Sequence, residues 1–169
     1  SLWRTQLPGT AVTLWLVDCP PLFERPGNPY QNEKGQDWWD NAHRFELFAR
    51  VGAMMAMGEV GLNWRPDLVH CNDWQAGLIP VFLEHCPDRP GTIFTIHNLA
   101  YQGLFSHETF RALGLPDSLW HWEQLEFHGQ LSFMKGGLVF SDRITTVSPS
   151  YAREIQTPEF GNGLEGVLR

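Results

Sequence analysis

Thr92-Ile-Phe-Thr-Ile96, followed at once by His97-Asn98, is the stretch that decides the fold. Its first five residues are apolar or β-branched, which is typical of a β-strand. Two polar residues come directly after it, at the position where open parallel sheets bind ligands. The stretch therefore predicts a strand with a ligand site at its carboxyl end.

A second strand of the same kind lies about 25 residues earlier. Asp67-Leu-Val-His70 is a short apolar run that leads into Cys71-Asn72-Asp73-Trp74. The carboxyl ends of neighbouring parallel strands meet at one edge of a sheet, so we expect both polar clusters to face one cleft. Asp73, His97 and Asn98 offer donors and acceptors for sugar hydroxyls, and Trp74 offers a ring on which a pyranose can stack. The two clusters predict a carbohydrate site.

The remaining elements alternate between strands and helices, an order that predicts an α/β fold with a parallel sheet in one domain. The stretch between Phe105 and Gly129 carries no clear period and is predicted only as short helices over the sheet. The other predicted elements are a buried strand at 12–17, an exposed loop at 24–32, a helix from 38 to near 58, a helix at 74–85 kinked at Pro80, a helix at 131–140 and a strand at 144–147.

Bulk composition excludes several classes of protein. The net charge is −7, with 12 Lys+Arg against 19 Asp+Glu and no basic run, which argues against nucleic acid as a partner. No apolar run reaches the roughly 20 residues of a membrane-spanning helix, so no membrane partner is expected. The 3 cysteines form no CxxC pair and fit a reducing, cytosol-like compartment.

Each candidate side chain also has a purely structural interpretation. Asp73 can cap the helix that starts at Trp74, and His97 can be a hydrogen-bonded histidine at a strand end. A zinc site built from His70, Asp73 and His97 lacks the usual ligand spacing. Cys71 has no base near it in sequence and fits a small buried hydrophobe better than a nucleophile. We therefore predict no metal and no cofactor.

Two further motifs have structural interpretations. Gly161-Asn-Gly-Leu-Glu-Gly166 matches a dinucleotide-binding pattern in letters, but no strand precedes it, so we interpret it as a turn that starts a short helix. Ser148-Pro149 has the residues of a helix start, with Ser148 as N-cap and Pro149 in the first turn. The amides of that turn can bind an anion, although a cap without a ligand is the favoured interpretation.

Four segments together resemble the ADP-glucose-dependent glycogen and starch synthases of bacteria and plastids, glycosyltransferase family 5. They occur in the family's order and, with the loop that begins at Asp18, span nearly the whole chain. The segments are His70-Cys-Asn-Asp-Trp-Gln-Ala-Gly-Leu-Ile-Pro80, Phe94-Thr-Ile-His-Asn-Leu-Ala-Tyr-Gln-Gly103, Ser132-Phe-Met-Lys-Gly-Gly-Leu138 and Thr146-Val-Ser-Pro-Ser-Tyr-Ala-Arg-Glu-Ile155.

The resemblance implies two Rossmann-like domains that face a cleft, the GT-B arrangement. It implies a retaining transfer of glucose from ADP-glucose to the 4-hydroxyl at the end of an α-1,4-glucan. His97 is then the catalytic residue, which binds the transferred glucose near its 6-hydroxyl, with its backbone carbonyl facing the developing positive charge. Asp73, Trp74, Asn98 and Tyr30 match positions that bind sugar or glucan, and Gln75 and Tyr101 are weaker candidates.

The sequence also departs from the family pattern. The family begins with a strand and a Lys-x-Gly-Gly-Leu loop that meets the donor diphosphate, and no such loop precedes Ser1. Lys135-Gly-Gly-Leu138 has a sequence similar to that loop, but it lies inside a predicted helix. We therefore assign it to helix packing. We therefore expect residues 1–169 to be an incomplete N-terminal, acceptor-side domain, which is inactive by itself and meets ADP-glucose only through absent segments.

The resemblance leaves two alternatives and two compartments open. A stand-alone glucan-binding module would use the same aromatic and polar residues without chemistry. Another GT-B enzyme, such as a sucrose synthase or a phosphorylase, shares the architecture, but His97-Asn-Leu-Ala-Tyr-Gln-Gly103 argues against it. The expected compartment is the cytoplasm of a bacterium, or the plastid stroma if the source is a plant.

Overall fold

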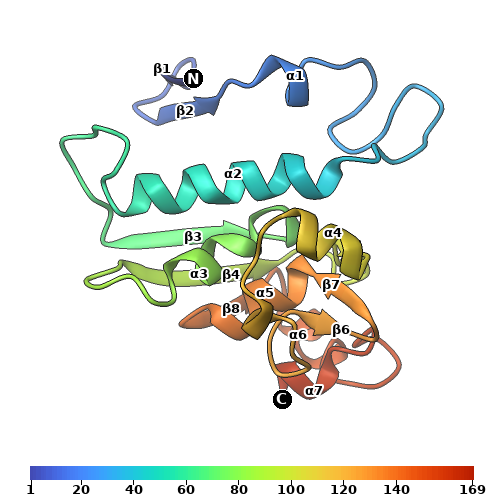
Figure 1. The fold of residues 1–169 in the computed structure, drawn as a ribbon. Coiled ribbons are helices and arrows are strands. Elements are labelled where there is room, and N and C mark those ends of the chain that lie inside the picture. Colours follow the sequence, from blue (N-terminus) through green and yellow to red (C-terminus); the bar gives the residue numbers. More distant parts are fainter. The chain divides into compact units, whose positions relative to one another are not determined.

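Three parallel strands form the sheet that the sequence predicts (Figure 1). They are β3 (Leu68–Asn72), β4 (Gly91–Ile96) and β8 (Arg143–Thr146), in the order β3-β4-β8. The computed structural model describes residues 1–169 and divides them into two compact units, 1–44 and 45–169. The sheet lies in the second unit, and it confirms the predicted α/β class with a parallel sheet.

The two faces of this sheet differ sharply in burial. Cys71 on β3 pairs with Phe94 on β4, and both side chains are almost fully buried on one face. The opposite face carries His70, Asn72 and Thr95, of which only Thr95 is buried. Alternation along each strand therefore gives the sheet an apolar face and a polar face.

Helix α5 (Phe133–Phe140) packs on the apolar face, as predicted for the Lys135-Gly-Gly-Leu138 motif. A Cβ atom on Gly137 would lie 2.1 Å from Cε2 of Phe94, so only glycine permits this close approach. Ser132 caps the helix, since its Oγ accepts a hydrogen bond from the amide of Lys135 at 3.1 Å. The start of the predicted helix is wrong, because Gln130–Ser132 form strand β7.

The predicted helix at 74–85 is broken at a different residue from the one expected. It consists of the 3-10 turn η1 (Trp74–Ala76) and helix α3 (Leu78–Leu83), with the break at Gly77. Pro80 lies within the first turn of α3, where its missing N–H has no intrahelical partner to lose. Gly77 is required by packing, since a Cβ there would lie 1.9 Å from the carbonyl oxygen of Phe133.

A small antiparallel sheet, absent from the predicted elements, lies in and directly beside the stretch that had no clear period. It has the order β5-β7-β6, from β5 (Leu104–Phe105), β7 and β6 (Glu126–Phe127). The predicted short helices are also present, as α4 (His107–Ala112) and the 3-10 turn η2 (Asp117–Leu119). Each strand has only 2 or 3 residues, which is too short for an alternating pattern to show in sequence.

The carboxyl-terminal elements follow the sequence prediction closely. Helix α6 (Pro149–Glu154) begins after Ser148, whose Oγ accepts a hydrogen bond from the amide of Tyr151 at 3.1 Å. Helix α7 (Glu165–Leu168) follows the glycine-rich turn that starts at Gly161. No strand runs into that turn, so the predicted interpretation of a turn before a short helix is confirmed.

In the first unit, the predicted buried strand at 12–17 is instead part of a hairpin. Strand β2 (Thr13–Val17) pairs antiparallel with β1 (Leu2–Gln6) in a separate two-stranded sheet, and none of its residues is fully buried. The strand itself is confirmed and only its predicted burial is wrong, because a short β-branched run looks the same in sequence whether it lies in an exposed hairpin or in a buried sheet. The short helix α1 (Pro20–Phe23) follows the hairpin.

Charged side chains order the loop that follows α1. Both terminal guanidinium nitrogens of Arg25 donate to the carboxylate of Asp40 at 2.6 Å. Arg44 donates to the backbone carbonyls of Leu22 at 2.7 Å and Pro29 at 2.8 Å. The loop then enters helix α2 (Asn41–Ala56), which confirms the predicted helix with a start three residues later than expected.

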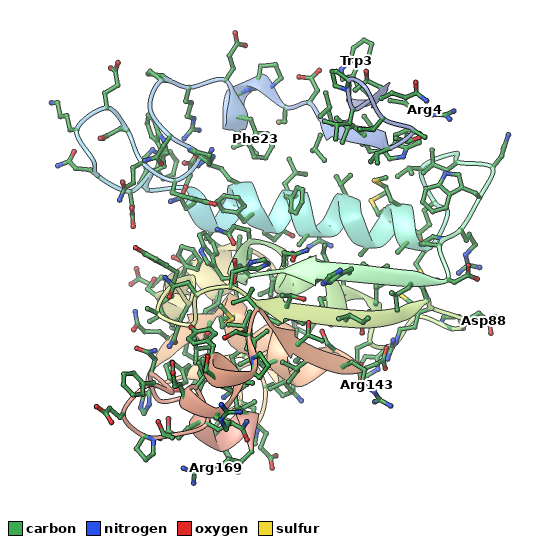
Figure 2. All side chains as sticks on the ribbon, turned by 180° about the vertical axis from the view of Figure 1, so that it is seen from behind. Trp3, Arg4, Phe23, Asp88, Arg143 and Arg169 are labelled. Atoms are coloured by element: carbon green, nitrogen blue, oxygen red, sulfur yellow. The ribbon has the colours of Figure 1, made fainter.

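Asp142 connects the amino-terminal ends of β4 and β8. Its carboxylate accepts hydrogen bonds from Arg89 at 2.8 and 3.0 Å and from the amide of Thr92 at 2.7 Å. Asp88 and Arg143, labelled in Figure 2, mark this edge of the sheet. The Arg89 guanidinium and then the Thr92 amide hold the pKa of Asp142 well below its usual range.

Replacing Asp142 by asparagine is expected to lower the free energy of unfolding at pH 7 by about 1 kcal/mol, discounted because the side chain is partly exposed. A carboxylate whose folded pKa is depressed stabilises the fold above its unfolded pKa, about 4, and this contribution is lost as pH falls through the folded pKa. Urea unfolding at pH 7 and at successively lower pH measures the difference. The control is Asp67→Asn, and equal effects of both substitutions would contradict the assignment.

None of the helices is both long enough and apolar enough to cross a membrane.

Candidate functional site

The polar residues that follow β3 and β4 are brought together, as the sequence predicts. Oδ1 of Asp73 accepts hydrogen bonds from the backbone amide of His97 at 2.8 Å and from that of Asn98 at 3.4 Å. The amide of Asp73 in turn donates to the carbonyl of Thr95 at 3.0 Å. The two strand ends are therefore tied to each other by one carboxylate and one backbone bond.

Asp73 does not have the capping role that was the structural alternative. Its side chain makes no cap bond to the turn that starts at Trp74, because its acceptor oxygen faces the other strand. Its backbone has φ 54° and ψ −178°, a conformation that few residues other than glycine adopt. Such strain is characteristic of functional sites, and here it turns the carboxylate across to β4.

The imidazole of His97 is exposed and makes one side-chain contact in the cluster. Its Nε2 lies 2.9 Å from Oδ1 of Asn72, the last residue of β3. Asn72 is not among the residues predicted for the site, although it stands beside Asp73 in the same strand-end motif. The register of β3 against β4, which only a structure supplies, brings Asn72 within reach of His97.

The loop after His97 is fixed by bonds from several elements. Oδ1 of Asn98 accepts from the amide of Ala100 at 3.0 Å, which turns the chain. The hydroxyl of Tyr151 on α6 accepts from the amide of Leu99 at 2.9 Å. Gln102 is buried and donates to the carbonyl of Asn162 at 3.0 Å. The loop after His97 is therefore held by segments 52 to 60 positions away from the loop residues that they contact.

The prediction that a sugar stacks on the ring of Trp74 is wrong, because that ring is buried. The side chain is only 8% exposed. Its ring packs edge-on against Phe45 at 4.7 Å between centroids, and Phe105 and Phe133 lie at 6.1 and 6.2 Å. A Cβ on Gly103 would lie 2.4 Å from the indole, so glycine backbone covers part of the ring as well. Trp74 is an anchor of the aromatic core under the site.

Two tyrosines remain as candidate sugar contacts. Tyr101 follows the His97 loop and is 68% exposed, which makes it a more accessible ring than Trp74. Tyr30 lies in the first unit and is 41% exposed, and its role at the sugar site stays a prediction. Its carbonyl accepts hydrogen bonds from the Trp38 amide at 3.0 Å and the Asn41 side chain at 2.9 Å, which fixes its backbone within that unit.

The zinc and cysteine alternatives do not fit the geometry. No group of three or more His, Cys, Asp and Glu side chains is close enough to hold a metal ion. Nε2 of His70 lies 2.6 Å from the hydroxyl of Thr95, within the polar face of the sheet. Burial raises the pKa of the Cys71 thiol to about 12, so the nucleophilic thiolate is absent at neutral pH.

Lys135 also has a structural role, in agreement with its predicted place in a packed helix. The side chain is buried, and its ammonium donates to the backbone carbonyls of Trp122 and Glu126. Burial lowers the pKa of Lys135. The ammonium therefore fastens the 122–126 loop to α5 instead of meeting a phosphate.

A hollow of about 420 Å³ lies at the open edge of the sheet. Its lining is largely apolar and comes from the end of β8, from α6 and from α7, with Ile144, Pro149, Ile155 and Leu168 among its residues. Ile96, the last residue of β4, lies on its wall and directly precedes His97. The Ser148 hydroxyl, at the start of α6, is engaged by the Tyr151 amide, which fits a cap.

Comparison with known proteins gives one consistent result. The family model described as the starch synthase catalytic domain matches residues 1–169. A glycogen synthase of Marinobacter nauticus is 79% identical over 170 residues, which cover 100% of this chain and 35% of that protein. A glycogen synthase of Cellvibrio japonicus is 61% identical over 169 residues, again 35% of its length. The chain thus spans about a third of the length of these curated relatives.

A solved structure supports the same relationship at the level of the fold. The catalytic domain of starch synthase IV from Arabidopsis thaliana, bound to ADP and acarbose, matches with a TM-score of 0.80 and 28% sequence identity. The match covers 99% of this chain and 34% of that one. With a family model that spans every residue and curated relatives above 60% identity, this chain belongs to the starch synthase catalytic domain family, glycosyltransferase family 5.

Proposed function

We propose that residues 1–169 are the incomplete N-terminal, acceptor-side domain of a retaining GT-B glucosyltransferase. The whole protein transfers glucose from ADP-glucose to the 4-hydroxyl at the non-reducing end of an α-1,4-glucan during glycogen or starch synthesis. The bond between the anomeric carbon and the diphosphate oxygen breaks, and a bond to the acceptor oxygen forms as that hydroxyl loses its proton. ADP leaves with the electron pair of the broken bond, and its departing diphosphate oxygen takes up the proton of the acceptor hydroxyl.

The observation that carries this proposal is the arrangement of Asp73, His97 and Asn98 at the joined ends of β3 and β4. Asp73 holds the amides of His97 and Asn98, so the imidazole and the following carboxamide are presented together on an exposed edge. Donors and acceptors in a fixed array suit a ligand that is rich in hydroxyl groups. The relatives named glycogen synthase and the starch synthase bound to ADP and acarbose support glucan and ADP-glucose as substrates.

Each residue has a role in the proposal. His97 binds the transferred glucose near its 6-hydroxyl, and its carbonyl faces the positive charge that develops on the sugar ring. Asn98 and Tyr30 bind the sugar and the glucan, and Tyr101 supplies the exposed ring. Asp73 acts through the amides that it holds, and Trp74 supports the site from below.

The compartment we propose is the bacterial cytoplasm, because the relatives named above come from bacteria. ADP-glucose and glucan would meet the enzyme there.

The test is a glucan-elongation assay on the whole protein with radiolabelled ADP-glucose and a maltooligosaccharide acceptor. We expect label in longer oligosaccharides that an α-1,4-specific glucanase digests, and less label from UDP-glucose at equal concentration. Glucan binding without transfer from either donor would overturn the proposal in favour of a glucan-binding module. Phosphate-dependent release of glucose 1-phosphate from glycogen would instead indicate a phosphorylase.

A further inference from the structure

The ring of His97 is oriented by a residue to which no role has been assigned. His97 follows β4 and is exposed, so the sheet does not pack its imidazole into one position. The contact that orients the ring within the strand-end cluster joins its Nε2 to Oδ1 of Asn72 at 2.9 Å. An exposed imidazole without such a contact would sample several rotamers and both neutral tautomers.

The register of the parallel strands explains why these two side chains meet. Asn72 lies opposite Thr95, and His97 is two residues beyond Thr95, so all three side chains belong to the polar face of the sheet. Asp73 fixes the backbone of His97, because its carboxylate accepts a hydrogen bond from the His97 amide at 2.8 Å. Backbone and ring are thus held by two consecutive residues of one strand end.

The chemistry of the contact selects one tautomer of the neutral ring. An amide oxygen can only accept a hydrogen bond, so Nε2 of His97 must carry the proton that is donated to Oδ1 of Asn72. Nδ1 then carries a lone pair and becomes an acceptor. The NH₂ group of Asn72 points the other way, with Nδ2 at 3.5 Å from the carbonyl of His70.

The neighbouring residues stabilise this orientation of the amide. A reversed Asn72 amide would place its NH₂ group against Nε2 and its oxygen against the carbonyl of His70. Because two acceptor oxygens cannot form a hydrogen bond with each other, the carbonyl of His70 favours the orientation in which Oδ1 of Asn72 faces the imidazole.

We propose that Asn72 is a positioning residue, which holds His97 as the Nε2–H tautomer so that Nδ1 accepts a hydrogen bond from a hydroxyl of the transferred sugar. The inference rests on the proposed function for the identity of the sugar. The tautomer itself does not depend on that function. A ring with the proton on Nδ1 would offer the hydroxyl a donor and leave the lone pair of Nε2 without a partner.

The experiment compares Asn72→Leu, which has a similar shape but no acceptor, with Asn72→Asp, which keeps an acceptor oxygen at the same place. Histidine-labelled whole protein is examined by ¹⁵N NMR at a pH where the ring is neutral, and His97→Ala assigns the signal. We expect a single Nε2–H tautomer in the wild type and in Asn72→Asp, and a mixture in Asn72→Leu. Asn63→Leu, in the exposed loop before β3, is the matched control.

Kinetics supply the second measurement. In the whole enzyme we expect Asn72→Leu to lower kcat about tenfold, the worth of one well-placed hydrogen bond, with a smaller change in KM for the glucan. Asn72→Asp should recover most of that loss. An unchanged tautomer in Asn72→Leu, or equal kcat in wild type and Asn72→Leu, would overturn the inference, whereas an inactive wild type would overturn the proposed function alone.

Discussion

Replacing His97 by alanine is expected to lower kcat of the whole enzyme by about 100-fold, the scale of losing one preorganised hydrogen-bonding group, here the imidazole that binds the transferred glucose. The substitution removes the imidazole that Asn72 orients and leaves the backbone amide bonded to Asp73. Because His97 is exposed, the melting temperature should stay close to that of the wild type. Initial rates with ADP-glucose and a maltooligosaccharide acceptor, together with thermal unfolding, measure both quantities.

His85→Ala is the matched control, since His85 is exposed in the turn after α3, away from the strand ends that carry His97. Its kcat should equal that of the wild type. A His97→Ala enzyme with more than half of the wild-type kcat would contradict the catalytic assignment. A large loss of stability with proportionate loss of activity would point to a structural histidine instead.

Residues 1–169 produced as a separate protein are expected to transfer glucose at least about 10⁴-fold more slowly than the whole enzyme, the scale on which cationic groups accelerate such departures. The leaving diphosphate carries negative charge that needs cations to stabilise it. The strand-end cluster offers an imidazole, two carboxamides and a carboxylate, and none of its members is a lysine or an arginine. Lys135 is buried, and its ammonium already donates to backbone carbonyls, so it is not free to meet the diphosphate.

The measurement places this separate protein and the whole enzyme side by side in the elongation assay at equal concentration. Circular dichroism must first show that the separate protein is folded. A titration with maltooligosaccharides then reports whether it retains its acceptor surface. Turnover by the separate protein close to that of the whole enzyme would contradict the proposal that these residues are half of an active site.

The parallel sheet and its ligand edge could be predicted because the signals there are local. Apolar runs of four or five residues ended in polar residues, and the strands β3, β4 and β8 lie where those runs lie. The start of α6 could likewise be predicted from two adjacent residues, the N-cap Ser148 and Pro149 in the first turn. Features of this kind depend on side-chain chemistry near one point in the chain, which the sequence displays directly.

The predictions that failed concern partners distant in sequence. Nothing in the run at 12–17 indicates that its neighbour is β1, and β-propensity is the same for either partner. The helix break fell at Gly77 because the carbonyl of Phe133 leaves no room for a Cβ, a contact across more than 50 residues. The exposed role expected of Trp74 failed for the same reason, since three aromatic rings from other segments cover it.

The residues of the site were easier to predict than the tasks they perform. Asp73, His97 and Asn98 could be selected because polar residues at strand ends are unusual. That Asp73 holds backbone amides, and that Asn72 faces the imidazole, depends on a strand register and on a positive φ angle. Neither quantity leaves a mark in composition or periodicity.

The backbone of Asp73 limits how this position can change during evolution. Its φ of 54° favours glycine, yet glycine would supply no acceptor for the amides of His97 and Asn98. Alanine and most larger residues meet neither demand. Asparagine offers a side-chain oxygen of the same reach on a side chain of the same size, and one base change separates its codons from those of aspartate. About two amino acids, aspartate and asparagine, therefore fit this position. The residue found there is a more stringent marker of a functional member of the family than the fold around it.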